Sequence, residues 1–406
     1  MFKQIITKPE EIEQIKSKVD EIAGVLKQDH YIPSEDNNLM IGRSGIALFF
    51  FYYSKLADDQ SSSDLGFDII SKIFDQLSLR NIHHSLSEGL AGIGWTLEHL
   101  IRNDFIEFED EQGLADLDAC LFKVMKETMK QGNYDLLHGA MGHGVFLLSR
   151  FKRTGNRHYL TSLIDELEKI SVTDENEGVK WLSHISSEGK IYEVNLGMAH
   201  GMASIISFLA ELHLNHINQE HLLHLLKSAV RYVLKYRQDP DKYFSFFPNS
   251  IHNGTPAKSR LAWCYGDLGI AIALLKAGKA LNDRNIIDLA LDILIHASHR
   301  RDLENNFVWD AGLCHGTAGI AHIFNRIYQQ TKIEELKDAA VYWTGQTLEM
   351  SKFKDGLAGY KSYRLPKNGS WENEAGLLEG IAGIGLSLLS MISDIKPKWD
   401  QCMLIG

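Results

Sequence analysis

The chain has little that would carry it into or across a membrane. Its N-terminal stretch, MFKQIITKPEEIEQIKSK, lacks the apolar core of a secretory signal peptide. A membrane-spanning helix needs about 18 uninterrupted apolar residues. The longest apolar run, from Ile46 to Tyr53, is much shorter. We therefore expect a cytosolic protein without stable membrane insertion.

Cysteine and basic charge are also scarce. The 406 residues include 4 cysteines, too few for a disulfide scaffold, so we expect reduced thiols. Lys and Arg number 42 against 53 Asp and Glu, which gives a formal net charge of −11. This charge argues against a nucleic-acid partner, because phosphates require a basic surface. The cysteines are Cys120, Cys264, Cys314 and Cys402.

Alternating strand patterns are sparse, and a glycine motif recurs instead. Only the stretches KIYEVNL, KYFSFFP and YKSYRL predict short hairpins, which we place in loops. The recurrent motif is Gly-x-x-Gly, once Gly-x-x-Ser, followed by an apolar run. Its copies begin 47 to 65 residues apart, which accommodates two helices and their connections. The first glycines are Gly42, Gly89, Gly139, Gly201, Gly266, Gly316 and Gly380.

Each repeat predicts one buried and one amphipathic helix. ASIISFLAELHL and GIAIALLKAGKAL are apolar nearly all round and predict inner helices. HLLHLLKSAVRYVLKYR and RNIIDLALDILIHASHR carry one apolar stripe and predict outer helices. We expect an all-α protein in which residues 1–406 form one domain, a seven-repeat α/α toroid (a double α-barrel with inner and outer rings of seven helices each). An open α-solenoid is the alternative, but inner helices without a polar face and terminal repeats without polar caps favour closure.

The residues directly before the first glycines indicate chemistry at one mouth of the predicted barrel. Six of the seven are polar or ionisable, whereas a helix start needs only a small or polar cap. Cys264 and Cys314 occupy one register, one position earlier, in neighbouring repeats, and His315 follows Cys314 directly. The seven residues are Ile41, Glu88, His138, His200, Tyr265, His315 and Glu379.

Cys264, Cys314 and His315 predict a zinc site. Three protein ligands with an open fourth position are typical of catalytic zinc, and thiolates with imidazole select zinc over magnesium or calcium. Helix N-termini add positive potential, which favours thiolates. Two inert core cysteines are the alternative. We expect one Zn²⁺ per chain.

His200 occupies the same position as His315 but has no neighbouring cysteine. This difference makes it a candidate acid or base rather than a metal ligand. A buried histidine with satisfied hydrogen bonds is the alternative.

These motifs resemble the lanthionine synthetase C-like family, the lanthipeptide cyclases. WCYG at Trp263–Gly266, CHG at Cys314–Gly316 and NLGMAHG at Asn195–Gly201 carry the resemblance, with the glycine-rich helix starts, over nearly the whole chain. It implies an α/α toroid with one zinc held by two cysteines and one histidine, which map onto the three residues named above. It also implies a dehydratase and a transporter as partners, and peripheral association with a membrane-bound biosynthesis and export complex.

The reaction implied by the resemblance joins a cysteine thiolate of a dehydrated precursor peptide, with its leader, to dehydroalanine or dehydrobutyrine. The product is a lanthionine or methyllanthionine thioether. His200, in AHG, is the matching catalytic acid or base, and Asp135, in YDLLHG, would orient it or tune its charge. Arg260, in RLAWCYG, would stabilise the enolate or hold a peptide carbonyl or carboxylate, and Tyr265 would donate a hydrogen bond to the same oxyanion.

The sequence departs from the family at two helix starts. Family members often have Pro-Gly after WCYG-x and AHG-x, where this chain has Leu268-Gly269 and Ala203-Ser204. We expect altered loop geometry there and no loss of chemistry.

Three other functions remain open. A thiol-adding enzyme that uses glutathione would keep the same zinc ligands. A glycosidase of the same fold would use carboxylates such as Glu88, Glu379 or Asp135, but it leaves the paired cysteines unexplained. A non-catalytic scaffold of a biosynthetic complex predicts a degraded zinc site, whereas all three ligands are present.

Overall fold

The structure is a computed structural model. Its described residues belong to two compact units: unit 1 (Met1–Glu109 and Phe307–Gly406) and unit 2 (Asp110–Asn306). The prediction that residues 1–406 form one domain stays a prediction. The described residues are 2–28, 36–77, 82–174, 178–184, 192–217, 220–251, 257–364 and 369–406.

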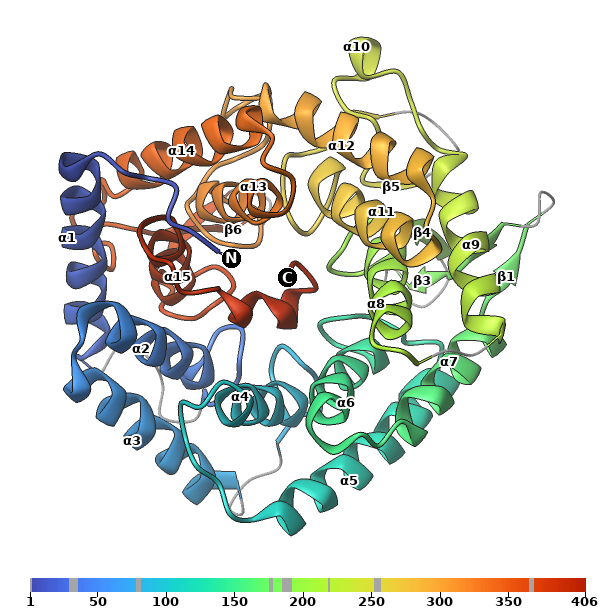
Figure 1. Ribbon diagram of the computed structural model, residues 1–406, viewed down its shortest axis with the longest axis horizontal. Coiled ribbons are helices and arrows are strands. Elements are labelled where there is room, and N and C mark those ends of the chain that lie inside the picture. The colour runs from blue at the N-terminus through green and yellow to red at the C-terminus, as the bar shows by residue number, and fades with distance from the viewer. Residues whose placement is uncertain are drawn as a thin grey trace. The chain divides into compact units, whose positions relative to one another are not determined.

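Both units are built mainly of helices (Figure 1). Unit 1 contains α1 (Pro9–Leu26), α2 (Arg43–Ala57), α3 (Gln60–Leu77), α4 (Leu90–Arg102), α13 (Thr317–Thr331), α14 (Glu334–Glu349), β6 (Ser362–Arg364), β7 (Ser370–Glu372), α15 (Ile381–Ile392) and the 3-10 helix η2 (Lys398–Met403). Unit 2 contains α5 (Glu111–Lys130), α6 (Ala140–Thr154), α7 (His158–Lys169), β1 (Val172–Thr173), β2 (Val179–Lys180), β3 (Ser183–His184), β4 (Tyr192–Asn195), α8 (Met202–Leu214), α9 (Glu220–Leu234), α10 (Pro240–Tyr243), β5 (Ser250–Ile251), α11 (Asp267–Leu281) and α12 (Arg284–Ser298).

All seven predicted inner helices are present, and each begins at the glycine motif. In each case the first glycine of the motif is the N-cap residue. These helices are buried over most of their length, and α15 is buried throughout, as their all-round apolar sequences predict. The inner helices are α2, α4, α6, α8, α11, α13 and α15.

Inner helices neighbour one another within each unit, and amphipathic helices pack on their outer side. In unit 1, α2 contacts α4 and α15, and α15 contacts α13. In unit 2, α8 contacts α6 and α11. Helices α3, α7, α9, α12 and α14 each pack on the inner helix that precedes them, so the predicted pairing of buried and amphipathic helices is confirmed for these five repeats (Figure 1). Helix α5, which follows α4 in the chain, contacts α6 and α7 of its own unit.

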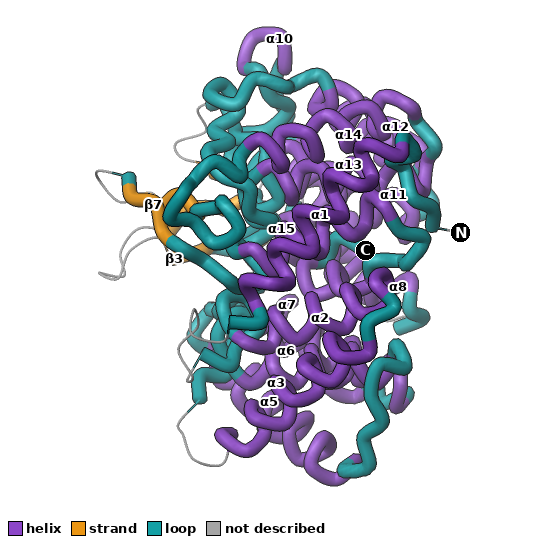
Figure 2. Tube along the Cα trace, turned by 90° about the vertical axis from the view of Figure 1, so that its left-hand side faces the viewer, coloured by secondary structure: helices purple, strands orange, loops and turns teal. Residues whose placement is uncertain are grey.

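The last inner helix takes its outer partner from the start of the chain. The element after α15 is the short helix η2, and the amphipathic helix that packs against α15 is α1. The N–H groups of Ile5 and Ile6 donate to the carbonyl of Met391, at 3.1 and 3.2 Å, which fixes the segment before α1 on α15. Both chain ends lie at the end of unit 1 away from β7 (Figure 2).

The strands are short and lie outside the helical layers (Figure 2). β6 pairs with β7 in the YKSYRL region, and β4 lies in KIYEVNL between β3 and β5, so strands form in both predicted regions. Lys190, Ile191 and Leu365, also in these stretches, lie outside the described residues. The prediction for KYFSFFP is wrong. Its first two residues end α10, and Phe244 takes a left-handed φ of 65°.

The glycine motif exists because the turn before each inner helix folds back on itself. A Cβ on Gly89 would overlap the carbonyl oxygen of His83, and one on Gly266 would overlap that of Arg260, six residues upstream in both cases. Gly266 also has a φ of 86°, which L side chains rarely adopt. The glycine is therefore required locally, by the backbone of its own turn.

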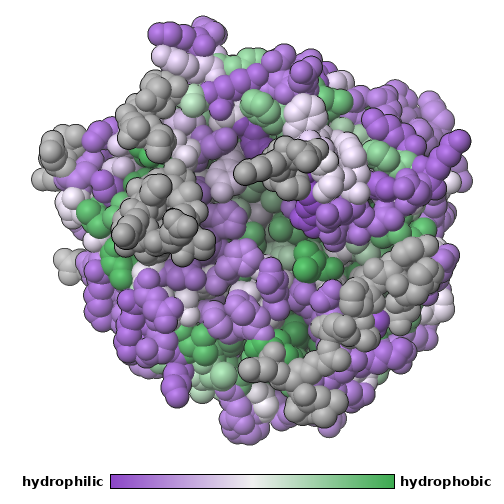
Figure 3. Space-filling view, turned by 180° about the vertical axis from the view of Figure 1, so that it is seen from behind, coloured by the Kyte–Doolittle hydropathy of each residue, from purple (hydrophilic) through white to green (hydrophobic). Residues whose placement is uncertain are grey.

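The face in Figure 3 is mostly hydrophilic, with hydrophobic residues exposed in separate small areas. In the part of the chain that the structure describes, no helix combines the length and the apolar character needed to cross a membrane.

Candidate functional site

The turns before the inner helices carry every candidate site residue. The N-cap glycines make no side-chain cap, unlike Asp283 of outer helix α12, whose carboxylate accepts the N–H groups of Asn285 and Ile286. The first N–H of an inner helix is satisfied by its own turn, as where Leu90 donates to the carbonyl of His83 at 2.8 Å. Helix capping in these turns therefore uses backbone groups, which leaves the side chains available for other roles.

Neighbouring turns are joined at equivalent positions by backbone hydrogen bonds. The bonds connect residues two positions before the N-cap glycines, the position that Cys264 and Cys314 occupy. In unit 1 the donors and acceptors are Cys314 N–H to Leu378 (3.0 Å), Leu378 N–H to Met40 (2.8 Å) and Met40 N–H to Ser87 (3.1 Å). In unit 2, Ala199 N–H donates to the carbonyl of Cys264 at 3.3 Å. Cys264 and Cys314 therefore occupy equivalent positions in their turns, and the backbone of each is hydrogen-bonded to the equivalent residue of a neighbouring turn.

His200 and Asp135, both predicted from the sequence, are directly paired in unit 2. The two lie 65 residues apart in the chain, and Nδ1 of His200 is 2.6 Å from Oδ2 of Asp135. The other oxygen of Asp135 accepts the N–H groups of Leu137 and His138, both at 2.8 Å. The carboxylate is therefore held by its own turn while it holds the imidazole.

The same pair sets the charge of the imidazole. Burial lowers the pKa of His200, but the hydrogen bond and charge of Asp135, with a smaller contribution from Cys264, raise it by more. The net result is a pKa above the usual value of 6.5. His200 therefore keeps its proton to a higher pH than an isolated histidine, which suits a proton donor.

Tyr265 lies against His200. The ring centroids are 6.2 Å apart, and the ring of His138 is also stacked on that of His200, at 5.9 Å. The Tyr265 hydroxyl accepts a hydrogen bond from Nδ2 of Asn195 at 3.3 Å. A Cβ on Gly197 would come within 2.8 Å of the Tyr265 ring, so the glycine in NLG makes room for it.

Cys264 and Arg260 lie in the turn before α11. Cys264 is 4% exposed and Trp263 beside it is fully buried. Arg260 is partly exposed, and its carbonyl oxygen is the group that Gly266 approaches. Unit 2 thus contains Cys264, Arg260 and Tyr265 on one turn, with Tyr265 beside the His200–Asp135 pair.

Cys314 and His315 lie in the turn before α13 of unit 1. Cys314 is 8% exposed, and the His315 side chain is 14% exposed. Nε2 of His315 is 3.4 Å from Oδ2 of Asp310, and Nδ1 is 3.9 Å from Oε1 of Glu379. The imidazole therefore lies between two carboxylates.

These carboxylates are held by their surroundings. Asp310 is 2% exposed and accepts the N–H groups of Gly312 (3.1 Å) and Tyr363 (2.9 Å). Burial raises the pKa of Asp310, but His315 and these N–H groups lower it by more, so the net pKa lies below its ordinary value. Burial raises the pKa of Glu379, against the opposing charges of His315 and Arg364.

Sequence reasoning missed Asn195 and Asp310. Both lie six residues before an N-cap glycine, as does Arg260, and all seven residues at this position are polar. Extending the repeat frame back by six residues would have found them. The seven are Asp36, His83, Asn133, Asn195, Arg260, Asp310 and Glu374.

Comparisons with known proteins identify relatives over most of the chain. Residues 33–404 match the family described as lanthionine synthetase C-like protein. The nisin biosynthesis protein NisC of Lactococcus lactis subsp. lactis is 26% identical over 352 residues, 79% of this chain and 77% of that protein. The glutathione S-transferase LANCL1 of Danio rerio is 22% identical over 334 residues, 78% of this chain and 76% of that protein.

A solved structure shows the fold. The nisin cyclase structure aligns with a TM-score of 0.75 at 21% identity and covers 96% of this chain and 97% of its own. This likeness confirms the predicted all-α class and the α/α toroid fold. The seven inner helices that begin at N-cap glycines agree with the seven predicted repeats.

Proposed function

The chain belongs to the lanthionine synthetase C-like family, and we propose that it is a zinc-dependent lanthipeptide cyclase. In this proposal a peptide cysteine adds to a dehydroalanine or dehydrobutyrine of the same dehydrated precursor. The observation that carries it is the His200–Asp135 pair, an imidazole with a raised pKa on the turn before α8. The likeness to the nisin biosynthesis protein NisC and to the nisin cyclase structure supports the proposal.

The donor set fits zinc. The ligands we propose are Cys264 of unit 2 and Cys314 and His315 of unit 1, all three on turns that precede inner helices. Two sulfurs and one imidazole nitrogen suit zinc and leave a position open for substrate. When bound, zinc would act as a Lewis acid that lowers the pKa of a substrate thiol, ordinarily about 8.5, toward neutrality.

The chain's own residues would manage the proton. The substrate thiol loses its proton, its sulfur bonds to the alkene β-carbon, and the alkene electron pair moves onto the neighbouring carbonyl oxygen. His200 holds Asp135 at Nδ1, so Nε2 is the nitrogen placed to deliver a proton to the α-carbon. The proton that the substrate thiol releases to solvent is replaced on His200 from solvent, so one proton is released and one consumed per ring, and no oxidant or reductant is needed.

Arg260 and Tyr265 are proposed to stabilise the negative oxygen. The hydroxyl of Tyr265 already accepts a hydrogen bond from Asn195, so its own proton is directed away from that amide. A phenol and a guanidinium aimed at a developing oxyanion lower the barrier most when they are held in place before reaction. Of the two, we assign Tyr265 as the residue that contacts the negative oxygen directly, because its ring lies beside that of His200.

The proposal includes partners and a location. A dehydratase must supply the dehydroamino acids, because nothing in the addition step makes the alkene. The substrate is the dehydrated precursor with its leader, and a transporter would take the product from the cytosol. Association with a membrane-bound complex of these proteins would be peripheral.

A glutathione-adding enzyme is the second candidate, favoured by the likeness to LANCL1 of Danio rerio. The two functions predict different products. Intramolecular cyclisation leaves the peptide mass unchanged and removes free thiols, whereas glutathione addition increases the mass by one glutathione and leaves the peptide thiols in place.

The test uses the purified full chain with a dehydrated precursor peptide, with and without glutathione. We expect one zinc per chain by metal analysis, and loss of alkylatable thiols at constant mass by mass spectrometry. Glutathione adducts without ring formation would replace the cyclase with the second candidate. Full zinc content with neither product would favour a non-catalytic scaffold.

A further inference from the structure

We propose that Arg300 is a positioning residue, because its guanidinium holds both ends of the turn that carries Arg260, Cys264 and Tyr265. This inference rests on the proposed function, which makes that turn part of the active site. Arg300 itself lies outside every recognised motif, two residues beyond α12.

The contacts of Arg300 reach the residue before the turn and the residue after it. One terminal nitrogen, Nη2, donates to the carbonyl of Ser259 at 2.7 Å. The other, Nη1, donates to Oδ2 of Asp267 at 3.1 Å. Ser259 directly precedes Arg260, and Asp267 follows Gly266 as the first residue of α11. One planar side chain thus sets the distance between the two ends of the turn.

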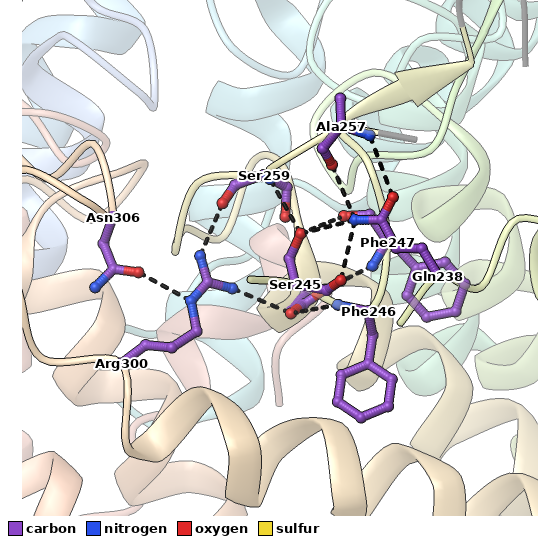
Figure 4. A network of polar contacts seen from close by, with 9 residues as sticks. Gln238, Ser245, Phe246, Phe247, Ala257, Ser259, Arg300 and Asn306 are labelled. Atoms are coloured by element: carbon purple, nitrogen blue, oxygen red, sulfur yellow. Dashed lines mark hydrogen bonds and ion pairs between the residues drawn. The ribbon is translucent and has the colours of Figure 1, made fainter. Parts of the chain in front are cut away.

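A second layer of contacts holds Arg300 and the start of the turn (Figure 4). Nε of Arg300 donates to Oδ1 of Asn306 at 2.9 Å, and the carbonyl of Asn306 accepts the N–H of Leu261 at 3.1 Å. The N–H of Ser259 donates to Oγ of Ser245 at 3.1 Å. Ser259 and Leu261, on either side of Arg260, are therefore both held by this network.

The far end of the turn is held through Asp267. Its carboxylate accepts the N–H groups of Phe246 (3.1 Å) and Phe247 (3.0 Å) in addition to Arg300. Ser245, next to them, accepts a hydrogen bond from Gln238 at 3.0 Å (Figure 4). The same carboxylate therefore joins the start of α11 to the loop after α10.

The network is buried, so its geometry is enforced. Asp267 is fully buried and Arg300 is 4% exposed. Burial raises the pKa of Asp267 to about 6, against the lowering by Arg300 and the two N–H groups, so the carboxylate is charged at neutral pH. Away from water, charge-assisted hydrogen bonds are strong, and a broken one leaves an unpaired buried charge. Such a network resists displacement of the turn.

The fifth turn is also the one whose backbone differs from the others. Gly266 has a φ of 86°, whereas the other six N-cap glycines have φ between −101° and −150°. In the turn before α13 the first N–H of the helix, from Thr317, donates to the carbonyl of Asp310 at 3.1 Å and joins the two ends directly. In the fifth turn, a side chain from α12's end joins them.

The alternative is that Arg300 only stabilises unit 2. A matched control exists for that alternative, because Arg150 and Asp118 form a second buried Arg–Asp pair in the same unit, with Nε 2.9 and 3.0 Å from the two carboxylate oxygens. Arg150 lies in α6 and Asp118 in α5, and neither belongs to a turn with candidate site residues.

The test compares Arg300→Gln with Arg150→Gln in the full chain. Iodoacetamide labelling of Cys264 is measured by mass spectrometry in chelator-stripped protein, with buried Cys402 of unit 1 as internal reference. We expect Arg300→Gln to raise the Cys264 rate about tenfold relative to Cys402, because the turn opens. Arg150→Gln should leave that ratio unchanged. In the zinc-loaded enzyme, kcat for Arg300→Gln should fall by about a hundredfold, as for a small misplacement of catalytic groups.

Equal Cys264 labelling and equal kcat in the two variants would overturn the proposal and leave Arg300 a stabilising residue. If Arg300→Gln does not fold, Asn306→Ala is the second variant. It removes the Nε contact and the 2.6 Å bond from Nδ2 of Asn306 to the carbonyl of Asp302, and it keeps both contacts of Arg300 to the ends of the turn. It should show the same labelling change at smaller size, and an unchanged ratio in that variant overturns the proposal as well. The labelling comparison needs no turnover, so inactivity of the unmodified enzyme would count against the proposed function alone.

Discussion

Three histidines directly precede an N-cap glycine, and two of them, His200 and His315, have different surroundings. His200, in unit 2, follows Ala199, and its Nδ1 lies 2.6 Å from Asp135, which comes from the preceding turn. His315, in unit 1, follows Cys314, and its Nε2 lies 3.4 Å from Asp310 of its own turn. The His200 side chain is 31% exposed and that of His315 14%.

The repeat places both imidazoles at the same position before a helix, and the residues around each imidazole determine what it can do. His315 follows a cysteine and has a carboxylate at Nε2, which suits a metal ligand whose ring is oriented by a carboxylate at its other nitrogen. A preceding alanine, a close carboxylate on Nδ1 and more exposure suit a group that exchanges protons with substrate. Four substitutions separate these two roles, beginning with the largest expected effect.

His315→Asn should remove both zinc and cyclisation. The asparagine side chain is shorter and a poorer zinc ligand than imidazole, and two cysteines alone hold the metal weakly. Metal analysis should show less than one zinc per chain, and thioether formation should fall to background. A variant with full zinc content would refute the ligand role.

His200→Asn should keep zinc and lose turnover. The substitution removes the proton donor but none of the three proposed ligands, so kcat should fall by about 10² to 10⁴ at full zinc content. Metal analysis and thiol-alkylation assays on the same sample make the comparison with His315→Asn direct. Unchanged turnover would remove His200 from the mechanism.

Asp310→Asn should weaken zinc binding while the three ligands stay in place. Loss of a carboxylate that orients a metal-binding histidine typically costs about 10- to 100-fold in affinity. Competition with a chromophoric chelator measures it. Asp355→Asn, which removes an exposed carboxylate paired with Lys361 in the same unit, is the control. Equal affinities in both variants would count against the orienting role.

Asp135→Asn should have the smallest effect on rate and a clear effect on pH dependence. Without the carboxylate, burial remains as the main influence on the pKa of His200 and lowers it. A proton donor is lost as the pH rises through its pKa, so the alkaline limb of kcat should move to lower pH. NMR titration of the His200 ring checks the direction. If the alkaline limb of the kcat profile stays at the same pH in Asp135→Asn, Asp135 does not set the pKa of His200.

The glycine motif predicted all seven inner helix starts because its cause is local. A side chain at Gly89 would overlap the carbonyl oxygen of His83, six residues upstream, so glycine is required wherever the chain forms the same turn. The hairpin predicted for KYFSFFP failed for a non-local reason. The N–H groups of Phe246 and Phe247 donate to the carboxylate of Asp267, about 20 residues away, and not to a neighbouring strand.

The sequence alone determined where the turns lie and which chemistry-bearing residues each one carries. The Gly-x-x-Gly motif, the apolar pattern of the helix after it and the position of a residue within its own turn are all short-range features of the sequence. Only the tertiary structure decided that Asp135 reaches His200, that α1 packs on α15, and that Arg300 holds the turn of Cys264. The His200–Asp135 and Arg300–Ser259 contacts join residues 65 and 41 positions apart, and they depend on helix packing that no local pattern records.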